Sequence, residues 1–163
     1  MPASSRLPSL GRRGEGWFAL QLVLMGLVAL SALTGVYWPD AVAGTLAVIG
    51  LVLIVAALLL LVGAGISLVA ARAITALPRP RAGSTVAQSG VYRIVRHPVY
   101  GAVLLIAVGW SLAESPLGLI PAALLAVVFD LKARLEEAWL EERHRDYGAY
   151  RRRTPHRFVP GIY

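Results

Sequence analysis

Hydrophobic residues gather in four uncharged runs that divide the chain. The runs cover 17–37, 41–71, 99–113 and 117–129, and polar segments separate them. Each of the first two is long enough, at about 1.5 Å per residue, to cross the ~30 Å hydrocarbon core of a bilayer as a helix. The last two are short for independent crossings, so we expect a helical hairpin that crosses as a pair, with a re-entrant hairpin as the alternative. The pattern therefore predicts an all-α integral membrane bundle with four transmembrane helices.

The hydropathy pattern indicates one membrane domain, 1–163, with five parts. These are an N-terminal segment 1–16, two spans in 17–77, a polar loop 78–98, the hairpin 99–130, and a polar helix with a tail in 131–163. Trp17 and Trp38 flank the first run, as interfacial anchors do. That run continues past Ala29-Leu30-Ser31-Ala32, which only loosely imitates a cleavage site, so we expect a retained span and not a cleaved signal peptide.

A second pattern begins at Asp130, where apolar residues recur every four positions. Leu131, Leu135 and Trp139 would share one face of a helix that leaves the membrane. Lys132 and Glu136 could form an ion pair on its polar face. The tail that follows carries clustered arginines and aromatic residues, which are typical of binding to anionic lipid headgroups. A tail that folds back over a cytoplasmic site is the alternative.

Charge assigns a membrane side to each part. All sixteen Lys and Arg residues precede the first run, lie between the second and third, or follow the fourth. Because positively charged loops stay inside, both termini and the loop 78–98 are expected in the cytoplasm. Arg93 and Arg96 should then reach water or lipid phosphate. The net charge of +7 follows from topology, so membrane lipids are expected as partners and nucleic acid is not.

Polar side chains converge where the hairpin opens toward the cytoplasm. Tyr92, His97 and Tyr100 stand at the start of the third run, and Glu136 and Glu137 follow the end of the fourth. Such a cleft suits a ligand with charged and aromatic parts. The sequence has no cysteine, no nucleophile with an adjacent base, no glycine-rich phosphate loop, and no metal-like spacing of its three histidines. Hydrolase, nucleotidase and metalloenzyme functions are therefore disfavoured, and no metal is expected.

The order and spacing of several motifs resemble a known family. They are Ser89-Gly90-Val91-Tyr92-Arg93, Arg96-His97-Pro98-x-Tyr100, Glu136-Glu137-x-x-Leu140, Tyr147-x-x-Tyr150 and Phe158-Val159-Pro160. Together they look like the isoprenylcysteine carboxyl methyltransferase family, whose pattern is shared with membrane phospholipid N-methyltransferases. The resemblance covers roughly residues 60 to 163. The Leu77-Pro78-Arg79-Pro80 segment and the short length resemble bacterial members, which implies a bacterial inner membrane.

The resemblance implies an S-adenosylmethionine-dependent methyltransferase that releases S-adenosylhomocysteine. Its cofactor would lie between the last two spans and the tail, and its acceptor would be a lipid or lipid-linked molecule. The residues implied to line the cofactor are Ser84, Thr85, Val86, Ala87, Tyr92, His97, Pro98, Val99, Tyr100 and Glu136.

Two departures from the family pattern concern the acceptor side and the tail. Lys132 stands where eukaryotic members carry an Arg that contacts the substrate carboxylate, and Arg134 is a candidate substitute. With Glu137, which would support Glu136, these residues make up the implied catalytic set. His144-Arg145-Asp146 replaces the usual aromatic-Gly pair, so the tail is expected to close differently. Two other classes stay open: a non-enzymatic membrane scaffold or lipid-binding protein, and an NADPH-dependent reductase of isoprenoid or sterol-like double bonds.

Overall fold

The computed structural model describes residue 10, residues 14–71 and residues 86–161, and every regular element in these ranges is helical. The α-helices are α1 (Glu15–Leu30), α2 (Asp40–Ala70), α3 (Pro98–Glu114), α4 (Leu119–Arg143) and α5 (Tyr147–Arg153). Short 3-10 helices are η2 (Ser31–Thr34), η3 (Gly90–Arg93) and η4 (Pro116–Gly118). The all-helical prediction is confirmed for the described part of the chain.

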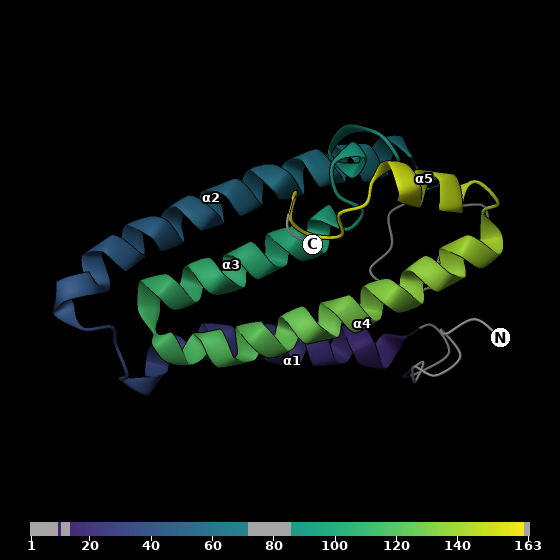
Figure 1. The fold of residues 1–163 in the computed structure, drawn as a ribbon. Helices are drawn as coiled ribbons and strands as arrows, with labels where there is room; N and C mark the ends of the chain where they lie inside the picture. The colour runs from purple at the N-terminus through teal and green to yellow at the C-terminus, as the bar shows by residue number, and fades with distance from the viewer. Residues whose placement is uncertain (1–9, 11–13, 72–85, 162–163) are drawn as a thin grey trace.

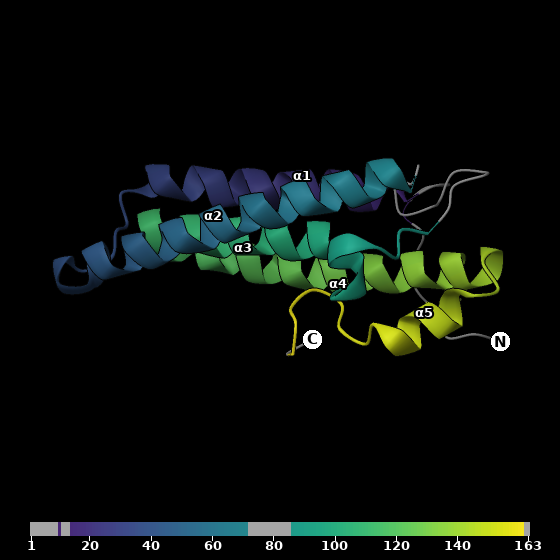
Figure 2. The same ribbon diagram turned by 90° about the horizontal axis from the view of Figure 1, so that it is seen from above.

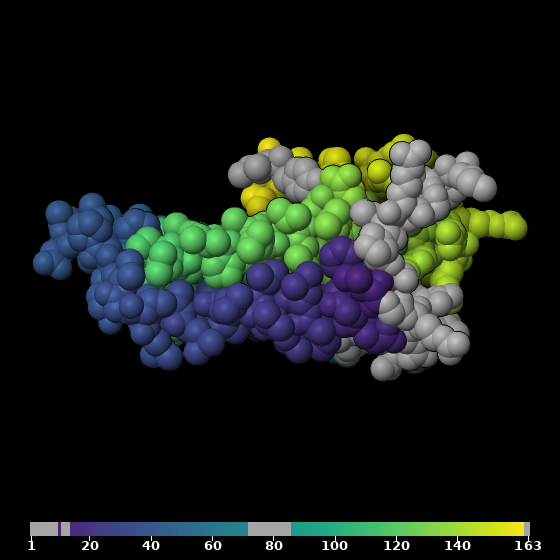
Figure 3. Space-filling model, turned by 90° about the horizontal axis from the view of Figure 1, so that it is seen from below, coloured from purple at the N-terminus to yellow at the C-terminus, as the bar shows by residue number. Residues whose placement is uncertain are grey.

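Four helices run alongside one another in an elongated bundle (Figure 1). Helix α3 lies between α2 and α4, and α1 packs along α4 (Figures 2 and 3). The turns that join α1 to α2 and α3 to α4 share one end of the bundle. The start of α3, the polar end of α4 and helix α5 share the other end, which we call the basic end because it carries the arginines of the tail.

Three helical stretches in the described residues are long and apolar enough to cross a membrane. They are Glu15–Thr34, Asp40–Ala70 and Pro116–Arg143, while Pro98–Glu114 is a shorter apolar helix. The last of the three continues without a break from the apolar run into the polar segment after Asp130. An integral membrane fold is therefore supported, and the fourth crossing, by α3, stays a prediction.

Contacts at the tip of the hairpin bear on that prediction. Ser115 Oγ, just after α3, donates to the carbonyl of Val36 at 2.7 Å, and Trp38 Nε1 donates to the carbonyl of Ser111 at 3.0 Å. Both bonds tie the hairpin tip to the turn between α1 and α2. Since the tip reaches the same end of the bundle as the first pair of helices, this geometry favours a full crossing over a re-entrant hairpin.

Aromatic and aliphatic side chains of α1 and α4 form the largest buried cluster. Trp17 and Val28 of α1 pack with Leu125, Phe129 and Ala133 of α4. Trp17 is only 4% exposed, so it fills the protein interior and does not act as the interfacial anchor expected from its position. Trp17 belongs to a buried cluster that includes Ala133 and Leu135, where α4 continues past the end of its apolar run.

Helices α2 and α3 approach each other through glycine. A Cβ added at Gly109 would lie 2.6 Å from the carbonyl oxygen of Gly50 and 2.9 Å from Ile54 Cγ1. Close backbone approach of this kind is the usual role of small residues in membrane helices, because it gains van der Waals contact where no hydrophobic effect acts.

We predict that Gly109→Ala lowers the thermal stability of the detergent-solubilised protein, since overpacking costs about 1–3 kcal/mol. Gly65→Ala is the matched control, because no atom lies within 4 Å of a Cβ at that position. Melting curves of the two variants test this. Equal melting temperatures would contradict the close α2–α3 contact.

Candidate active site

The tail holds Arg96 and His97, the two residues before α3, in place through backbone hydrogen bonds. His97 precedes α3, and Pro98 opens the helix at a position that requires no N–H donor. The backbone N–H of His97 donates to the carbonyl of Arg157 at 2.8 Å, and that of Arg96 donates to His156 at 3.0 Å. A Cβ at Gly101 would meet the carbonyl oxygen of Phe158 at 2.6 Å. The tail therefore folds back over the first turn of α3. This arrangement is one of the two alternatives that the sequence left open for the tail.

Glu137 is the centre of a buried ionic network. Its Oε1 accepts from Arg96 Nε at 2.8 Å and lies 3.1 Å from His97 Nε2. Its Oε2 accepts from Arg157 Nη2 at 3.3 Å. The side chains of Arg96 and Glu137 are only 5% and 4% exposed. Glu137 therefore joins α4, the start of α3 and the tail.

The burial of Arg96 corrects the expectation that it reaches water or lipid phosphate. Besides Glu137, its guanidinium donates through Nη1 to the carbonyls of Thr154 and Pro155 at 2.6 and 2.7 Å. A buried charge needs a counter-charge and paired donors to offset the loss of water. Glu137 and the tail supply both, and a loop sequence alone does not indicate such partners.

Glu136, the neighbouring carboxylate, is more accessible. Its side chain is 22% exposed, and its Oε2 accepts from the Tyr100 hydroxyl at 2.9 Å and lies 3.7 Å from His97 Nδ1. The rings of His97 and Tyr100 are stacked with centroids 5.3 Å apart, and Tyr100 stacks on Phe129 at 4.7 Å. His97 thus lies between the two carboxylates, and Glu136 forms the accessible side of the cluster.

Lys132 lies one turn earlier on α4 and is almost completely buried, at 1% exposure. Its Nζ donates to Gln21 Oε1 of α1 at 2.7 Å and lies 4.9 Å from the centre of the Tyr100 ring. Gln21 therefore replaces Glu136 as the hydrogen-bond partner expected for Lys132. Its ammonium gains electrostatically from the ring face. Arg134, in contrast, is 53% exposed and pairs with Asp130 at 2.7 Å, away from this cluster.

The remaining predicted cofactor residues lie on the α2 side of the α3 start. Ala87 and Tyr92 are buried with Ala64 of α2, and Val99 packs against them. Val86 and Pro98 are half-buried and buried, respectively. The predicted residues Ser84 and Thr85 lie outside the described part of the chain. Burial, with the charge of Glu136 second, raises the pKa of Tyr92, so its hydroxyl stays protonated at neutral pH.

Helix α5 attaches to this region through tyrosine. The hydroxyl of Tyr150, which is 3% exposed, donates to the carbonyl of Tyr92 at 2.8 Å. Burial raises the pKa of Tyr150 to about 12, which keeps the hydroxyl in its donating form. Tyr147 is also buried and packs edge-on against Tyr150.

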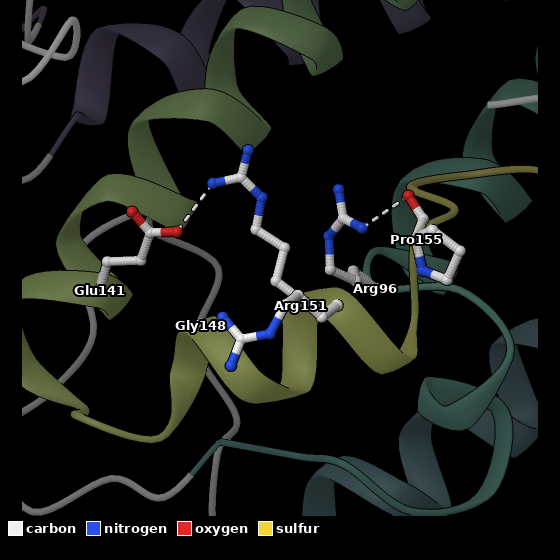
Figure 4. A pocket seen from close by; sticks show the side chains of 6 residues that line it. Arg96, Glu141, Gly148, Arg151 and Pro155 are labelled. Carbon is white, nitrogen blue, oxygen red and sulfur yellow. Dashed lines mark hydrogen bonds and ion pairs between the residues drawn. The ribbon is translucent and has the colours of Figure 1, made fainter.

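A pocket of about 420 Å³ opens beside Arg96 (Figure 4). Its lining comes from the loop before α3, from α4, from α5 and from the tail: Arg96, Glu141, Gly148, Arg151, Arg152 and Pro155. Arg151 pairs with Glu141 across its mouth at 2.7 Å. The pocket gives solvent a route to the edge of the buried network.

Residues 79–147 match the family model of the phospholipid methyltransferases. The resemblance to membrane methyltransferases is confirmed. The matched segment contains α3 and α4 with His97, Tyr100, Glu136 and Glu137. A search of curated proteins finds no significant match to the chain.

Contacts of the site that the sequence patterns did not predict come from residues outside the matched segment, 79–147. Arg157 of the tail pairs with Asp130 at 2.6 Å as well as with Glu137. Phe158 lies edge-on to the rings of His97 and Tyr100. For Gln21, the one available signal was an amide side chain in an otherwise apolar span, which is costly unless it finds a partner.

We predict that Glu137→Gln lowers the free energy of unfolding by about 3–5 kcal/mol, because it leaves the buried Arg96 without its counter-charge. Glu141→Gln removes the same charge from the exposed pair with Arg151 and should cost less than about 1 kcal/mol. Reversible unfolding in mixed micelles measures both. A loss of similar size in the two variants would show that the network does not hold the tail.

Proposed function

We propose that this chain is an S-adenosylmethionine-dependent membrane methyltransferase that methylates an oxygen or nitrogen of a lipid or lipid-linked acceptor. One observation carries the proposal. The family match spans both the His97–Tyr100 stretch and Glu136, and these residues, far apart in sequence, touch in the structure. A membrane scaffold would not need a solvent-accessible carboxylate, that of Glu136, beside the stacked rings of His97 and Tyr100.

The described residues fit the chemical groups of this cofactor. Its sulfonium and amino groups are cationic, and a partly exposed Glu136 beside the ring of Tyr100 suits a cation. Its carboxylate needs a donor, which the ring of His97, beside Glu136, can provide. Ala87, Tyr92 and Val99 offer an apolar wall for an adenosine group. We infer that Glu136, Tyr100 and His97 bind the polar part of the cofactor.

When bound, the cofactor supplies an activated methyl group, so the protein needs to align the acceptor and exclude water. Alignment of two reactants in a closed site supplies much of the rate of such a transfer. Glu137 fixes the ring of His97, and Phe158 of the tail covers that ring and Tyr100. These contacts keep the binding groups in one arrangement. The tail, through Phe158, then forms one side of the site.

Lys132 is the residue that we assign to the acceptor side. Its buried ammonium lies within the bundle, at the interface between α4 and α1. Lys132 precedes Glu136 by one helical turn and is therefore nearer the apolar half of α4. A positive charge there attracts an acidic acceptor group, and it also lowers the pKa of an amine, which must lose its proton before it accepts a methyl group. We propose that the acceptor enters sideways from the bilayer and that both termini and the cofactor mouth face the cytoplasm.

We predict that the purified protein in detergent binds S-adenosylhomocysteine at micromolar or better affinity, and that Glu136→Gln weakens this binding at least ~10-fold, because it removes a charge-assisted contact. Glu142→Gln, on the exposed face of α4, is the matched control and should bind as the unaltered protein does. Isothermal titration measures the affinity, and a melting curve confirms that both variants are folded.

Absence of S-adenosylhomocysteine binding by the unaltered protein would overturn the proposal. Stabilisation by NADPH in its place would favour a reductase. Equal affinities of the two glutamate variants would remove Glu136 from the cofactor site.

A further inference from the structure

A second pocket, of about 380 Å³, lies on the other side of the α5 C-terminus. Its lining residues are Gln88, Arg93, Tyr150, Arg153 and Thr154. None of them is assigned above to the cofactor or the acceptor. Among the described residues that line this pocket there is no carboxylate, so two guanidinium groups give this lining a net positive charge. We call it the Arg93–Arg153 pocket.

Hydrogen bonds build this pocket from two segments that are far apart in sequence. Arg153 Nη2 donates to Gln88 Oε1 at 3.1 Å, and the Thr154 hydroxyl donates to the carbonyl of Arg93 at 3.4 Å. The hydroxyl of Tyr150, which lines the pocket, donates to the carbonyl of Tyr92 and so ties α5 to the segment that carries Arg93. The relative positions of the two arginines are therefore set by α5 and by the loop before α3 together.

The charges of Arg93 and Arg153 differ from those of neighbouring arginines. Arg96 is neutralised by Glu137, Arg151 by Glu141 and Arg157 by Asp130. Arg153, in contrast, bonds a neutral amide. A pair of guanidinium groups that is not offset by a carboxylate favours an anion, and their planar forks match phosphate oxygens.

The depth of the pocket in the membrane follows from contacts with α2. A Cβ at Gly90 would lie 2.5 Å from Ser67 Oγ, and one at Gly63 would lie 3.0 Å from Val91 Cγ1. Gly63 and Ser67 lie about 35 and 40 Å along the helix from Asp40 at 1.5 Å per residue. The hydrocarbon core ends after ~30 Å, and headgroups extend several ångströms further. The loop that carries Arg93 therefore lies at headgroup depth.

The part of α2 just before Gly63, nearer the hydrocarbon core, offers a surface for acyl chains. Leu58, Leu59 and Val62 are each more than half exposed. A ligand that joins a phosphate to hydrocarbon chains could therefore occupy the pocket and lie along α2. We propose that Arg93 and Arg153 bind the phosphate of an anionic membrane lipid at the basic end of the bundle, at a site separate from that of methyl transfer.

The test is a titration of the delipidated protein in neutral detergent with phosphatidylglycerol, followed by native mass spectrometry. We expect saturable binding that Arg93→Gln and Arg153→Gln each weaken at least ~10-fold, since each removes a charge-assisted contact to the phosphate. Arg145→Gln and Arg152→Gln are the matched controls. Both residues are exposed and lie outside this pocket, so their loss should change the affinity less than about two-fold.

Three results would overturn the inference. Equal weakening by all four substitutions would show diffuse attraction to a basic surface. Equal affinity for phosphatidylcholine would show that the negative charge is not recognised. Competition by free glycerol phosphate at the same concentration as the lipid would identify a soluble phosphoanion as the ligand. Affinity of the variants for S-adenosylhomocysteine should stay unchanged, so the outcome is independent of the proposed methyl transfer.

Discussion

A guanidinium and a carboxylate buried at the mouth of a membrane bundle organise the basic end of this protein. Arg96 and Glu137 are almost inaccessible, and ionised groups stay buried only when their charge and donors are satisfied. Glu137 meets this demand with His97 and Arg157, and Arg96 meets it with two tail carbonyls. The same contacts that satisfy the pair therefore draw the tail onto α3 and α4.

Two adjacent carboxylates on α4 have different tasks as a result. Glu137 is surrounded by three nitrogen-bearing side chains and is closed to solvent, whereas Glu136 has one strong partner, Tyr100, and keeps an accessible edge. Successive residues on a helix point in different directions, so one carboxylate can hold the structure while its neighbour faces a ligand. We propose that Glu136 binds the cofactor in an arrangement that Glu137 holds.

The hydrophobic runs predicted the helices and their order, because period and length depend on local sequence. They also predicted that His97 and Tyr100 would meet Glu136, since a hairpin brings its two open ends together. The tail carbonyls that bind Arg96 and the Gln21 amide that binds Lys132 could not be predicted this way. Both depend on segments more than fifty residues away, the tail and α1, and a pattern that assigns a residue to a face does not say which segment covers that face.

Transfer of a labelled methyl group from S-adenosylmethionine to the lipids of a membrane extract tests the central claim most directly. The account predicts label in the lipid-soluble fraction when the unaltered protein is present, and loss of that label with Glu136→Gln. Identification of the labelled lipid then gives the acceptor. An absence of labelled product from a folded protein that binds S-adenosylhomocysteine, or undiminished labelling by the Glu136 variant, would contradict the account.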